Sequence, residues 1–468
     1  MTQQFQEQGG AATMDPKPIA RSLASAQISP LVRPEKLAKN RSKIEQQRIS
    51  AGNAHVVEYF HQVDDGYSHL AAQMLQPLAA RYDIELRCHL VSGPTGNNSV
   101  EPALLLKLAA EDSAHIAPHY GLAFPRHDAP LQPGLVQLAT SILAAQDEKS
   151  FINCAADVGH ALWADDQAAL QALAEQYGSA SQAQVQTCVE LGSERRSKLK
   201  HYSGAMFYYA GEWYWGVDRL YHLENRLVEL GAVRPAPASA HDGSNTKNLL
   251  APRPVLETGN LKDDGRLTLE IYPSLRSPYT AISFDRAVKL ASDTGVNLVV
   301  RPVLPMVMRG VPATREKGLY IFKDTAREAR AAGVPFGNFY DPIGEPVRRC
   351  YSLYPWACEQ GKGIELLSCF LRAAFTEGVN TNNDKGLQTV VENAGLDWQV
   401  AKTLVGKPGW EELLESNRLA MYDAGLWGVP SFRLLDENGE QVLALWGQDR
   451  LWLFASKIQD LLAARQTG

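Results

Sequence analysis

The chain has 468 residues, of which 45% are hydrophobic and 21% are charged, and its formal net charge is −6. This composition is typical of a globular protein, and a mildly acidic chain without a basic stripe is not expected to bind nucleic acid. No apolar run is long enough to span a bilayer, so we expect no membrane partner.

Cysteine usage and the N-terminus both favour the cytoplasm. The six cysteines include no pair at C-x-x-C spacing, which favours reduced thiols over a disulfide framework and predicts no metal site. The polar, Gln-rich N-terminus lacks the basic start and apolar core of a secretory signal. We therefore expect a cytoplasmic protein.

The first predicted segment is a flexible N-terminal tail, residues 1–53. It is rich in Gln, Ala, Ser and basic residues and has little apolar periodicity. A short helix near residues 34–48 is the exception that we expect within it.

The remainder of the chain consists of two halves built on the same plan. The segment that starts at Glu58 aligns without a gap with the segment that starts at Glu270 for about thirty residues. The halves also end alike, in Trp-Gly-Val-Asp-Arg-Leu and Trp-Gly-Gln-Asp-Arg-Leu. We interpret this as a tandem duplication. The two lobes are then residues 54–232 and 266–468, joined by a Pro-rich linker, residues 233–265.

Each lobe is predicted to open with a strand, a helix and a second strand, which implies a parallel pair with a right-handed crossover. The predicted strands are residues 56–60 and 84–91 in lobe one, and 267–272 and 296–303 in lobe two. The middle of each lobe is predicted to be helical, and in lobe two this includes residues 325–332, 363–377 and 385–394.

A hairpin and a last helix are expected to close each lobe. In lobe two the hairpin strands are residues 432–435 and 441–445, around the strong turn signal Asn438-Gly439. Lobe one has the shorter segment 206–215. This order of elements is that of a thioredoxin fold with a helical domain inserted in its middle, which places the chain in the α/β class.

Ser277-Pro278-Tyr279-Thr280 stands where the first strand of lobe two meets its helix. Serine is a favoured N-cap and proline a favoured first helical residue, so capping alone explains them. A helix start also offers partial positive charge and free N–H groups that stabilise an anion such as a thiolate. Both interpretations stay open. The segment contains no C-x-x-C pair, which excludes disulfide exchange by a C-x-x-C mechanism.

Three further positions have two interpretations each. Pro430, in Gly428-Val429-Pro430, is either a strand-entry proline or part of a cis bond that turns the Val429 backbone toward an extended peptide. Asp449 either complements the dipole of the last helix or receives a ligand ammonium. Lys317 is either a solvated surface lysine or a contact for a ligand carboxylate.

Together and in this order, these segments resemble the DsbA-like branch of the thioredoxin superfamily. Within it they are similar to the 2-hydroxychromene-2-carboxylate isomerase and kappa-class glutathione transferase family. The resemblance covers about 200 residues of lobe two and rests on Ser277-Pro278-Tyr279, Lys317-Gly318-Leu319-Tyr320, Gly428-Val429-Pro430 and Gly447-Gln448-Asp449-Arg450. It implies two tandem thioredoxin-like lobes, each with a helical insertion.

By this resemblance, Ser277 is the catalytic residue and contacts the sulfur of a glutathione cofactor. Val429 would contact the cysteinyl backbone of glutathione and Lys317 the rest of the tripeptide. The γ-glutamyl end would be held by Gln448 and Asp449. The complete set of implied cofactor-binding residues is Pro278, Tyr279, Lys317, Val429, Pro430, Gln448 and Asp449.

Lobe one serves as a comparison within the same chain. It has Asp65-Gly66 in place of Ser277-Pro278, and a carboxylate repels a thiolate. Ala205 stands in place of Pro430, and no Lys-Gly-Leu-Tyr occurs near Leu105. Lobe one is therefore interpreted as a degenerate copy with a structural or regulatory role.

The function expected from these residues is that of a glutathione-dependent isomerase acting on an unsaturated or aromatic carboxylate, with a small molecule as its partner. The alternatives are a kappa-like glutathione S-transferase and a non-catalytic thioredoxin-fold binding protein. All eleven histidines lie between His55 and His241. A site in lobe two would therefore work without an imidazole base or a His-ligated metal.

Overall fold

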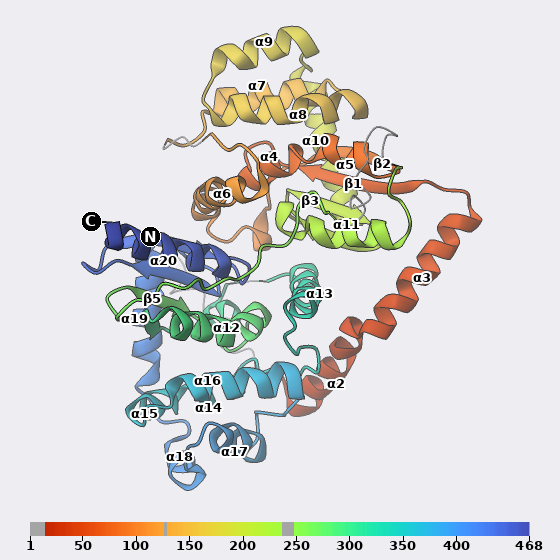
Figure 1. The fold of residues 1–468 in the computed structure, drawn as a ribbon. Helices are drawn as coiled ribbons and strands as arrows, with labels where there is room; N and C mark the ends of the chain where they lie inside the picture. The colour runs from red at the N-terminus through yellow and green to blue at the C-terminus, as the bar shows by residue number, and fades with distance from the viewer. Residues whose placement is uncertain (1–14, 126–128, 236–247, 312, 468) are drawn as a thin grey trace. The chain divides into compact units, whose positions relative to one another are not determined.

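The structure is a computed structural model that describes residues 15–125, 129–235, 248–311 and 313–467. It divides into two compact units, each with one four-stranded sheet (Figure 1). We call Asn40–Pro254 the N-terminal unit, and Met1–Lys39 together with Val255–Gly468 the C-terminal unit. Within the described ranges, none of the helices combines the length and the apolar character that a bilayer crossing requires.

The N-terminal unit places a layer of helices between its second and third strands in sequence. Helices α7, α8 and α9 lie together there, and α8 packs against α4 (Figure 1). The elements are β1 (His55–His61), α4 (Gly66–Ala72), α5 (Leu75–Arg81), β2 (Ile84–Leu90), η3 (Gly96–Asn98), α6 (Pro102–Ile116), η4 (Ala117–Tyr120), α7 (Pro133–Ala144), α8 (Glu148–Trp163), α9 (Gln167–Tyr177), α10 (Gln182–Lys198), β3 (Met206–Tyr209), β4 (Glu212–Trp215), η5 (Val217–Arg219) and α11 (Leu220–Glu229).

In the C-terminal unit, the long helix α12 packs against α13, α16 and α20, and the sheet and these helices share one apolar core. The elements are α2 (Pro18–Ile28), η2 (Ser29–Val32), β5 (Thr268–Tyr272), α12 (Pro278–Thr294), β6 (Asn297–Val300), η6 (Met306–Arg309), α13 (Arg315–Ala332), α14 (Glu345–Tyr351), α15 (Tyr354–Glu359), α16 (Gly363–Arg372), a π-helical turn η7 (Ala373–Glu377), α17 (Asp384–Asn393), α18 (Trp398–Leu404), α19 (Trp410–Asp423), β7 (Ser431–Leu435), β8 (Gln441–Trp446) and α20 (Leu451–Thr467).

The two sheets have the same strand order, β2-β1-β3-β4 and β6-β5-β7-β8. In each, the first two strands are parallel and the hairpin pairs antiparallel with the first strand. This confirms the predicted β-α-β unit and closing hairpin in both halves. Their origin by duplication stays an interpretation.

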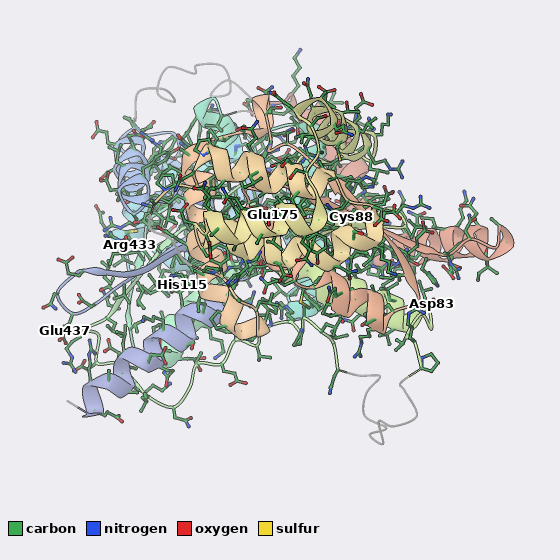
Figure 2. All side chains as sticks on the ribbon, turned by 90° about the horizontal axis from the view of Figure 1, so that it is seen from above. Asp83, Cys88, His115, Glu175, Arg433 and Glu437 are labelled. Carbon is green, nitrogen blue, oxygen red and sulfur yellow. The ribbon has the colours of Figure 1, made fainter. Side chains whose placement is uncertain are left out.

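Buried carboxylates at equivalent positions strengthen this likeness. Glu270 on β5 accepts hydrogen bonds from Arg301 at 2.7 Å and from Arg433 at 3.4 Å; Arg433 lies on β7 and is labelled in Figure 2. Glu58 on β1 is held by Arg195 at 2.6 Å and by His89 at 3.0 Å. Burial alone would raise the pKa of Glu58, but these two hydrogen bonds lower it to about 2.

Element boundaries agree with the predictions to within a few residues, with one larger difference. Helix α13 begins at Arg315, ten residues before the predicted start at Thr325. The Thr314 hydroxyl accepts a hydrogen bond from the Lys317 N–H, and this cap fixes the earlier start.

The prediction of a flexible tail is wrong for the described residues 15–53. Most of this segment forms α2, η2 and α3 (Pro34–Ser50). The side chain of Arg21 is fully buried in the C-terminal unit. Composition missed this because α2 packs through serines and an arginine rather than through an apolar stripe. The predicted residues 1–14 of the tail lie outside the described part of the chain.

The predicted linker, residues 233–265, contains the boundary between the units at Pro254 and Val255. Its described part includes no regular helix or strand. Asp263 within it is buried and accepts a hydrogen bond from the Leu267 N–H at 2.8 Å. The linker residues 236–247 lie outside the described part.

Candidate functional site

Ser277 is the N-cap of α12, and Pro278 is the first residue of the helix. The Ser277 Oγ accepts a hydrogen bond from the Thr280 N–H at 3.2 Å. The capping interpretation is therefore confirmed. Capping does not exclude the binding of an anion such as a thiolate. Ser277 is half-exposed at a helix start, where N–H groups without a partner in the helix favour an anion.

The loop before the hairpin meets this helix start. The Val429–Pro430 peptide bond is cis, which confirms the predicted cis bond; the contact with an extended peptide stays a prediction. The Ser277 Oγ lies 3.4 Å from the carbonyl oxygen of Val429 and donates to it. Val429 is half-exposed, and its N–H has no hydrogen-bond partner among the described residues. Two segments 152 residues apart in sequence thus form one site.

Thr280 occupies the position of the second cysteine of a C-x-x-C motif, and it is buried. Its Oγ1 lies 3.4 Å from the Ser274 N–H, from which it accepts a hydrogen bond. The side chain therefore belongs to the interior of the unit. Neither position of the motif offers a thiol here.

Tyr279 links the helix start to a buried ion pair. Its hydroxyl donates to Asp324 at 2.8 Å, and Asp324 accepts from Arg327 at 2.6 Å. Tyr67 in the N-terminal unit donates in the same way to Asp112 at 2.7 Å. Both tyrosine–aspartate pairs are 45 residues apart in sequence. Because the pair recurs where Ser277 and Pro430 do not, it serves the fold of both units.

Lys317 lies in the first turn of α13 and is half-buried. Burial lowers the pKa of its ammonium group, because the charged form loses solvation. Lys317 is therefore not a fully solvated surface lysine. Such a lysine gains from a carboxylate ligand, since the ligand replaces part of the lost solvation.

Gln448 and Asp449 lie in the turn immediately before α20, which begins at Leu451. Gln448 is buried, and its amide donates to Glu328 at 3.0 Å and accepts from Arg286 at 3.5 Å. Its side chain is therefore engaged inside the unit. Asp449 is half-buried, with a carboxylate oxygen 3.5 Å from Arg450 Nη1.

Sequence reasoning missed Arg276, the residue directly before Ser277. Its guanidinium pairs with both carboxylate oxygens of Asp341, at 3.1 and 3.2 Å. A cation beside the N-cap is visible in the sequence and could have been noticed. Its partner could not, because Asp341 follows 65 residues later in a loop without a recognisable motif.

The equivalent position in the N-terminal unit has different chemistry. Asp65 caps α4 by accepting hydrogen bonds from the Ser68 N–H at 3.1 Å and the Ser68 hydroxyl at 2.8 Å. Burial raises the pKa of Asp65 to about 6. Ala205 has a φ of 53° and accepts from the Gly216 N–H at 2.7 Å, just as Pro430 accepts from Gly447 at 3.0 Å. The prediction that Ala205 occupies the position equivalent to Pro430 agrees with this geometry.

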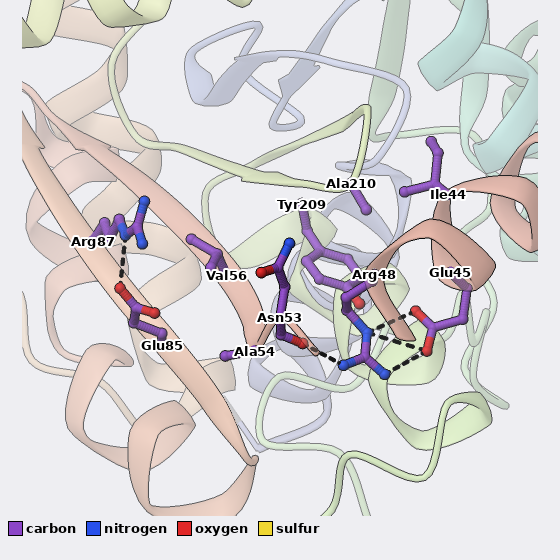
Figure 3. Close-up of a pocket in the computed structure, with 10 residues that line it drawn as sticks. All are labelled: Ile44, Glu45, Arg48, Asn53, Ala54, Val56, Glu85, Arg87, Tyr209 and Ala210. Atoms are coloured by element: carbon purple, nitrogen blue, oxygen red, sulfur yellow. Dashed lines mark hydrogen bonds and ion pairs between the residues drawn. The ribbon is translucent and has the colours of Figure 1, made fainter. Parts of the chain in front are cut away.

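The N-terminal unit also contains a cavity of about 360 Å³ at the start of β1 and β2 (Figure 3). Its charged side chains are paired with each other, Arg48 with Glu45 and Arg87 with Glu85. Asp65 follows the other end of β1, so the cavity is separate from the position equivalent to Ser277. In the described ranges, no three His, Cys, Asp or Glu side chains are grouped as a metal ion would require.

Comparison with known proteins identifies the fold of the C-terminal half. A family model for the DSBA-like thioredoxin domain matches residues 268–459. No curated protein matches the chain. The predicted resemblance to the DsbA-like branch is confirmed for these residues.

Three solved structures with similarity to this chain each match less than half of its length. A 2-hydroxychromene-2-carboxylate isomerase is 20% identical, and the match covers 43% of this chain and 97% of the isomerase chain, with a TM-score of 0.36. A probable DsbA oxidoreductase from Streptomyces coelicolor is 20% identical, with 42% and 90% covered and a TM-score of 0.33. The cytosolic disulfide reductase DsbM from Pseudomonas aeruginosa, with GSH, is 19% identical, with 43% and 100% covered and a TM-score of 0.31.

Proposed function

Because residues 268–459 are a DSBA-like thioredoxin domain without a C-x-x-C motif, we propose that the C-terminal unit binds glutathione and catalyses an isomerisation. The reaction is of the 2-hydroxychromene-2-carboxylate isomerase type, on an unsaturated or aromatic carboxylate. We propose the cytoplasm as its location, and the six free cysteines support this assignment.

One contact carries this proposal, the hydrogen bond between the Ser277 Oγ and the Val429 carbonyl oxygen. It brings the helix start, the hydroxyl and the Val429 N–H, to which no described residue bonds, to one place. A hydroxyl at a helix start favours a thiolate supplied by a ligand. A free backbone N–H beside it suits the extended backbone of a short peptide. Glutathione combines both features.

Glutathione, when bound, would supply a thiolate that adds to an unsaturated acid and leaves again after bond rotation, so that no electrons are gained or lost overall. The Ser277 hydroxyl is the donor that this thiolate requires. Its hydrogen bond to Val429, at 3.4 Å, is long enough to be exchanged for one to sulfur. Lys317, with its lowered pKa, suits a carboxylate of the tripeptide.

The γ-glutamyl end would be held by Asp449 and by the backbone of the turn before α20. Asp449 can receive an ammonium group because its carboxylate is only half-buried. The Gln448 side chain positions this turn through Glu328 rather than touching the ligand. Pro278, Tyr279 and Pro430 would form the walls around the thiol.

Calorimetric titration of the full chain with glutathione tests the proposal. We expect saturable binding that is lost or weakened at least tenfold in Ser277→Ala and in Asp449→Ala, since each removes one charge-assisted hydrogen bond. Asp218→Ala, which changes the equivalent residue of the N-terminal unit, is the matched control and should bind normally. Absence of binding to the wild type would reject the proposal, and unchanged binding in both variants would reject the site.

The same titration, followed by the ultraviolet absorbance of the thiolate, separates catalysis from mere binding. A thiolate-stabilising site lowers the pKa of the bound thiol, and Ser277→Ala should return it toward the free value. Binding without any shift in the thiol pKa would favour the non-catalytic binding protein. A thioether product that stays attached to glutathione would instead identify the kappa-like transferase.

A further inference from the structure

Helix α2 binds the main chain of a loop that lies more than 300 residues later in sequence. The Arg21 guanidinium donates to the carbonyl oxygens of Asp341 at 2.7 Å and Ile343 at 2.5 Å. The Ser25 hydroxyl accepts from the Asp341 N–H at 3.0 Å. Just after α2, the Ser29 hydroxyl bonds both the N–H and the C=O of Phe339, at 3.0 and 3.1 Å.

These contacts fix Asp341 through its main chain, and its carboxylate is fixed as well. Asp341 Oδ1 accepts from the Ile343 N–H at 3.1 Å, and the same carboxylate holds the Nε and Nη2 of Arg276. A guanidinium held in this fork has little remaining freedom. Arg276 is therefore placed by a chain of contacts that starts at α2.

Arg276 is placed where a ligand can reach it. It directly precedes Ser277 at the start of α12, and its side chain is 32% exposed. Its Nη1 has no hydrogen-bond partner among the described residues. A planar donor beside a helix start is suited to a carboxylate, since the backbone N–H groups and the partial positive charge act with it.

The N-terminal unit again provides a comparison. At the constant spacing of the two units, Arg276-Ser277 corresponds to Asp64-Asp65. The unit that lacks the proposed thiolate site thus carries two carboxylates where the other has a cation and a hydroxyl. Two adjacent acids repel an anionic ligand. We therefore assign Arg276 to a function that only the C-terminal unit has.

We propose that Arg276 binds the carboxylate of the second, unsaturated substrate at the Ser277 site, and that α2 holds Arg276 in place through Asp341. This inference rests on the proposed function for its choice of substrate. Arg276 is then a specificity-determining residue, and Arg21, Ser25, Ser29 and Asp341 are positioning residues. The segment before the N-terminal unit becomes part of the site of the C-terminal unit.

Binding of trans-cinnamate and of cinnamamide, measured without glutathione by ligand-observed NMR, tests the role of Arg276. The two probes share shape and differ in charge. We expect wild type to prefer cinnamate, and Arg276→Gln to weaken cinnamate binding about tenfold or more while leaving cinnamamide unchanged. Arg276→Lys keeps the charge without the fork and should be intermediate. Arg266→Gln removes an exposed arginine of the same unit and should change nothing.

Several outcomes would overturn the assignment: no preference of the wild type for cinnamate, equal losses of both probes in Arg276→Gln, or normal cinnamate binding in that variant. Failure of the proposed function is seen separately, as absent glutathione binding. A protein that prefers cinnamate through Arg276 but ignores glutathione would keep the carboxylate site and lose the isomerase.

The role of α2 is tested with the double variant Ser25→Ala, Ser29→Ala. It removes the serine hydrogen bonds to residues 339 and 341, keeps the bond from Arg21, and leaves Arg276 and Ser277 intact. We expect cinnamate affinity to fall severalfold while glutathione affinity stays within twofold, because only the Arg276 branch is released. A lower Tm with an unchanged ratio of cinnamate to cinnamamide affinity would mean that α2 has a merely structural role.

Discussion

Ser277 and Asp65 cap equivalent helices, but Ser277 does so with a hydroxyl group and Asp65 with a carboxyl group. The Ser277 hydroxyl both accepts from the helix and donates to Val429. With a pKa near 6, the Asp65 carboxyl is mostly ionised at neutral pH and then only accepts. Of these two capping side chains, only that of Ser277 can therefore donate a hydrogen bond to a thiolate at neutral pH.

The paired tyrosines give a prediction at the same scale. Tyr279→Phe leaves Asp324 without one of its donors, and Tyr67→Phe does the same to Asp112. Each variant should lower the free energy of unfolding by about 1 to 3 kcal/mol, the cost of an unsatisfied buried acceptor. Urea denaturation of both variants checks this.

Equal losses are expected because the two hydrogen bonds have nearly the same length and setting. Tyr340→Phe, which removes a solvent-exposed hydroxyl contact with Ser22, is the control and should cost little. A loss confined to Tyr279→Phe would show that the pair belongs to the site and not to the shared fold.

Among the elements, helix α2 packs against the C-terminal unit mainly through polar side chains. Ile19 and Leu23 on it are exposed, whereas Arg21 and Ser25 are buried. Hydrogen bonds to a loop therefore hold this part of α2, and apolar contact with the core is added at its end by Ile28.

Arg21→Ala should therefore destabilise the C-terminal unit strongly. It leaves the carbonyl groups of Asp341 and Ile343 without their donor inside the unit, at a cost of about 2 to 4 kcal/mol. Hydrogen exchange in increasing urea, followed on peptides from residues 255–468, measures this. Arg33→Ala, which changes an exposed arginine directly after η2, should have no such effect. Equal protection in both variants would mean that α2 is only loosely attached.

A substitution in the hairpin turn of the N-terminal unit is expected to increase the stability of that unit. Ala210 and Gly211 form its two-residue turn with φ of 47° and 88°. An alanine is strained in this region, whereas asparagine tolerates it. Ala210→Asn should raise the free energy of unfolding by roughly 0.5 to 1 kcal/mol.

Thermal unfolding of Ala210→Asn beside Ala210→Ser checks this origin of the gain. Serine is polar like asparagine but has no preference for the left-handed region. Only the asparagine variant should therefore have the higher Tm. An equal gain in both would point to solvation of the turn rather than to its backbone.

For the whole molecule, the distribution of histidines predicts an acid response confined to one unit. His61, His69 and His201 are buried in the N-terminal unit, and burial lowers the pKa of each to about 3. Neutral histidine is favoured in the folded unit, so its stability is present above the unfolded pKa of about 6.5 and is lost as the pH falls below it. The C-terminal unit contains no histidine.

Each buried histidine costs up to about 1.4 kcal/mol for every pH unit below its unfolded pKa. Asp65 acts in the opposite direction, because its folded pKa is raised to about 6 and its contribution is lost as the pH rises through 6. The neighbours act in the same direction as burial: His160 beside His69 and Arg196 beside His201 lower these pKa values further, and His61 hydrogen-bonds the neutral hydroxyl of Tyr59. The net effect is destabilisation on acidification.

Hydrogen exchange at pH 7 and pH 5, normalised to the unfolded chain, checks this prediction. Protection should fall in residues 55–232 and persist in residues 268–459. The variant His69→Gln should reduce the difference, since it removes one of the buried imidazoles. Protection lost first in the C-terminal unit would contradict the expected order.

Local patterns in the chain were sufficient to predict the strands, the hairpins, the α/β class and the residues at the start of α12. They are short-range features: alternation, turn signals and caps depend on neighbours a few residues apart. The internal comparison of the halves also identified Asp65 and Ala205 as departures before any contact was known.

Folding decided what depends on residues distant in sequence. Whether Ser277 meets Val429, whether Gln448 is buried, and whether Arg276 has a partner depend on segments 65 to 162 residues apart. The N-terminal segment was misread for the same reason. Its polar composition predicts disorder, because composition cannot register that Arg21, Ser25 and Ser29 satisfy the backbone of a loop some 310 to 320 residues later.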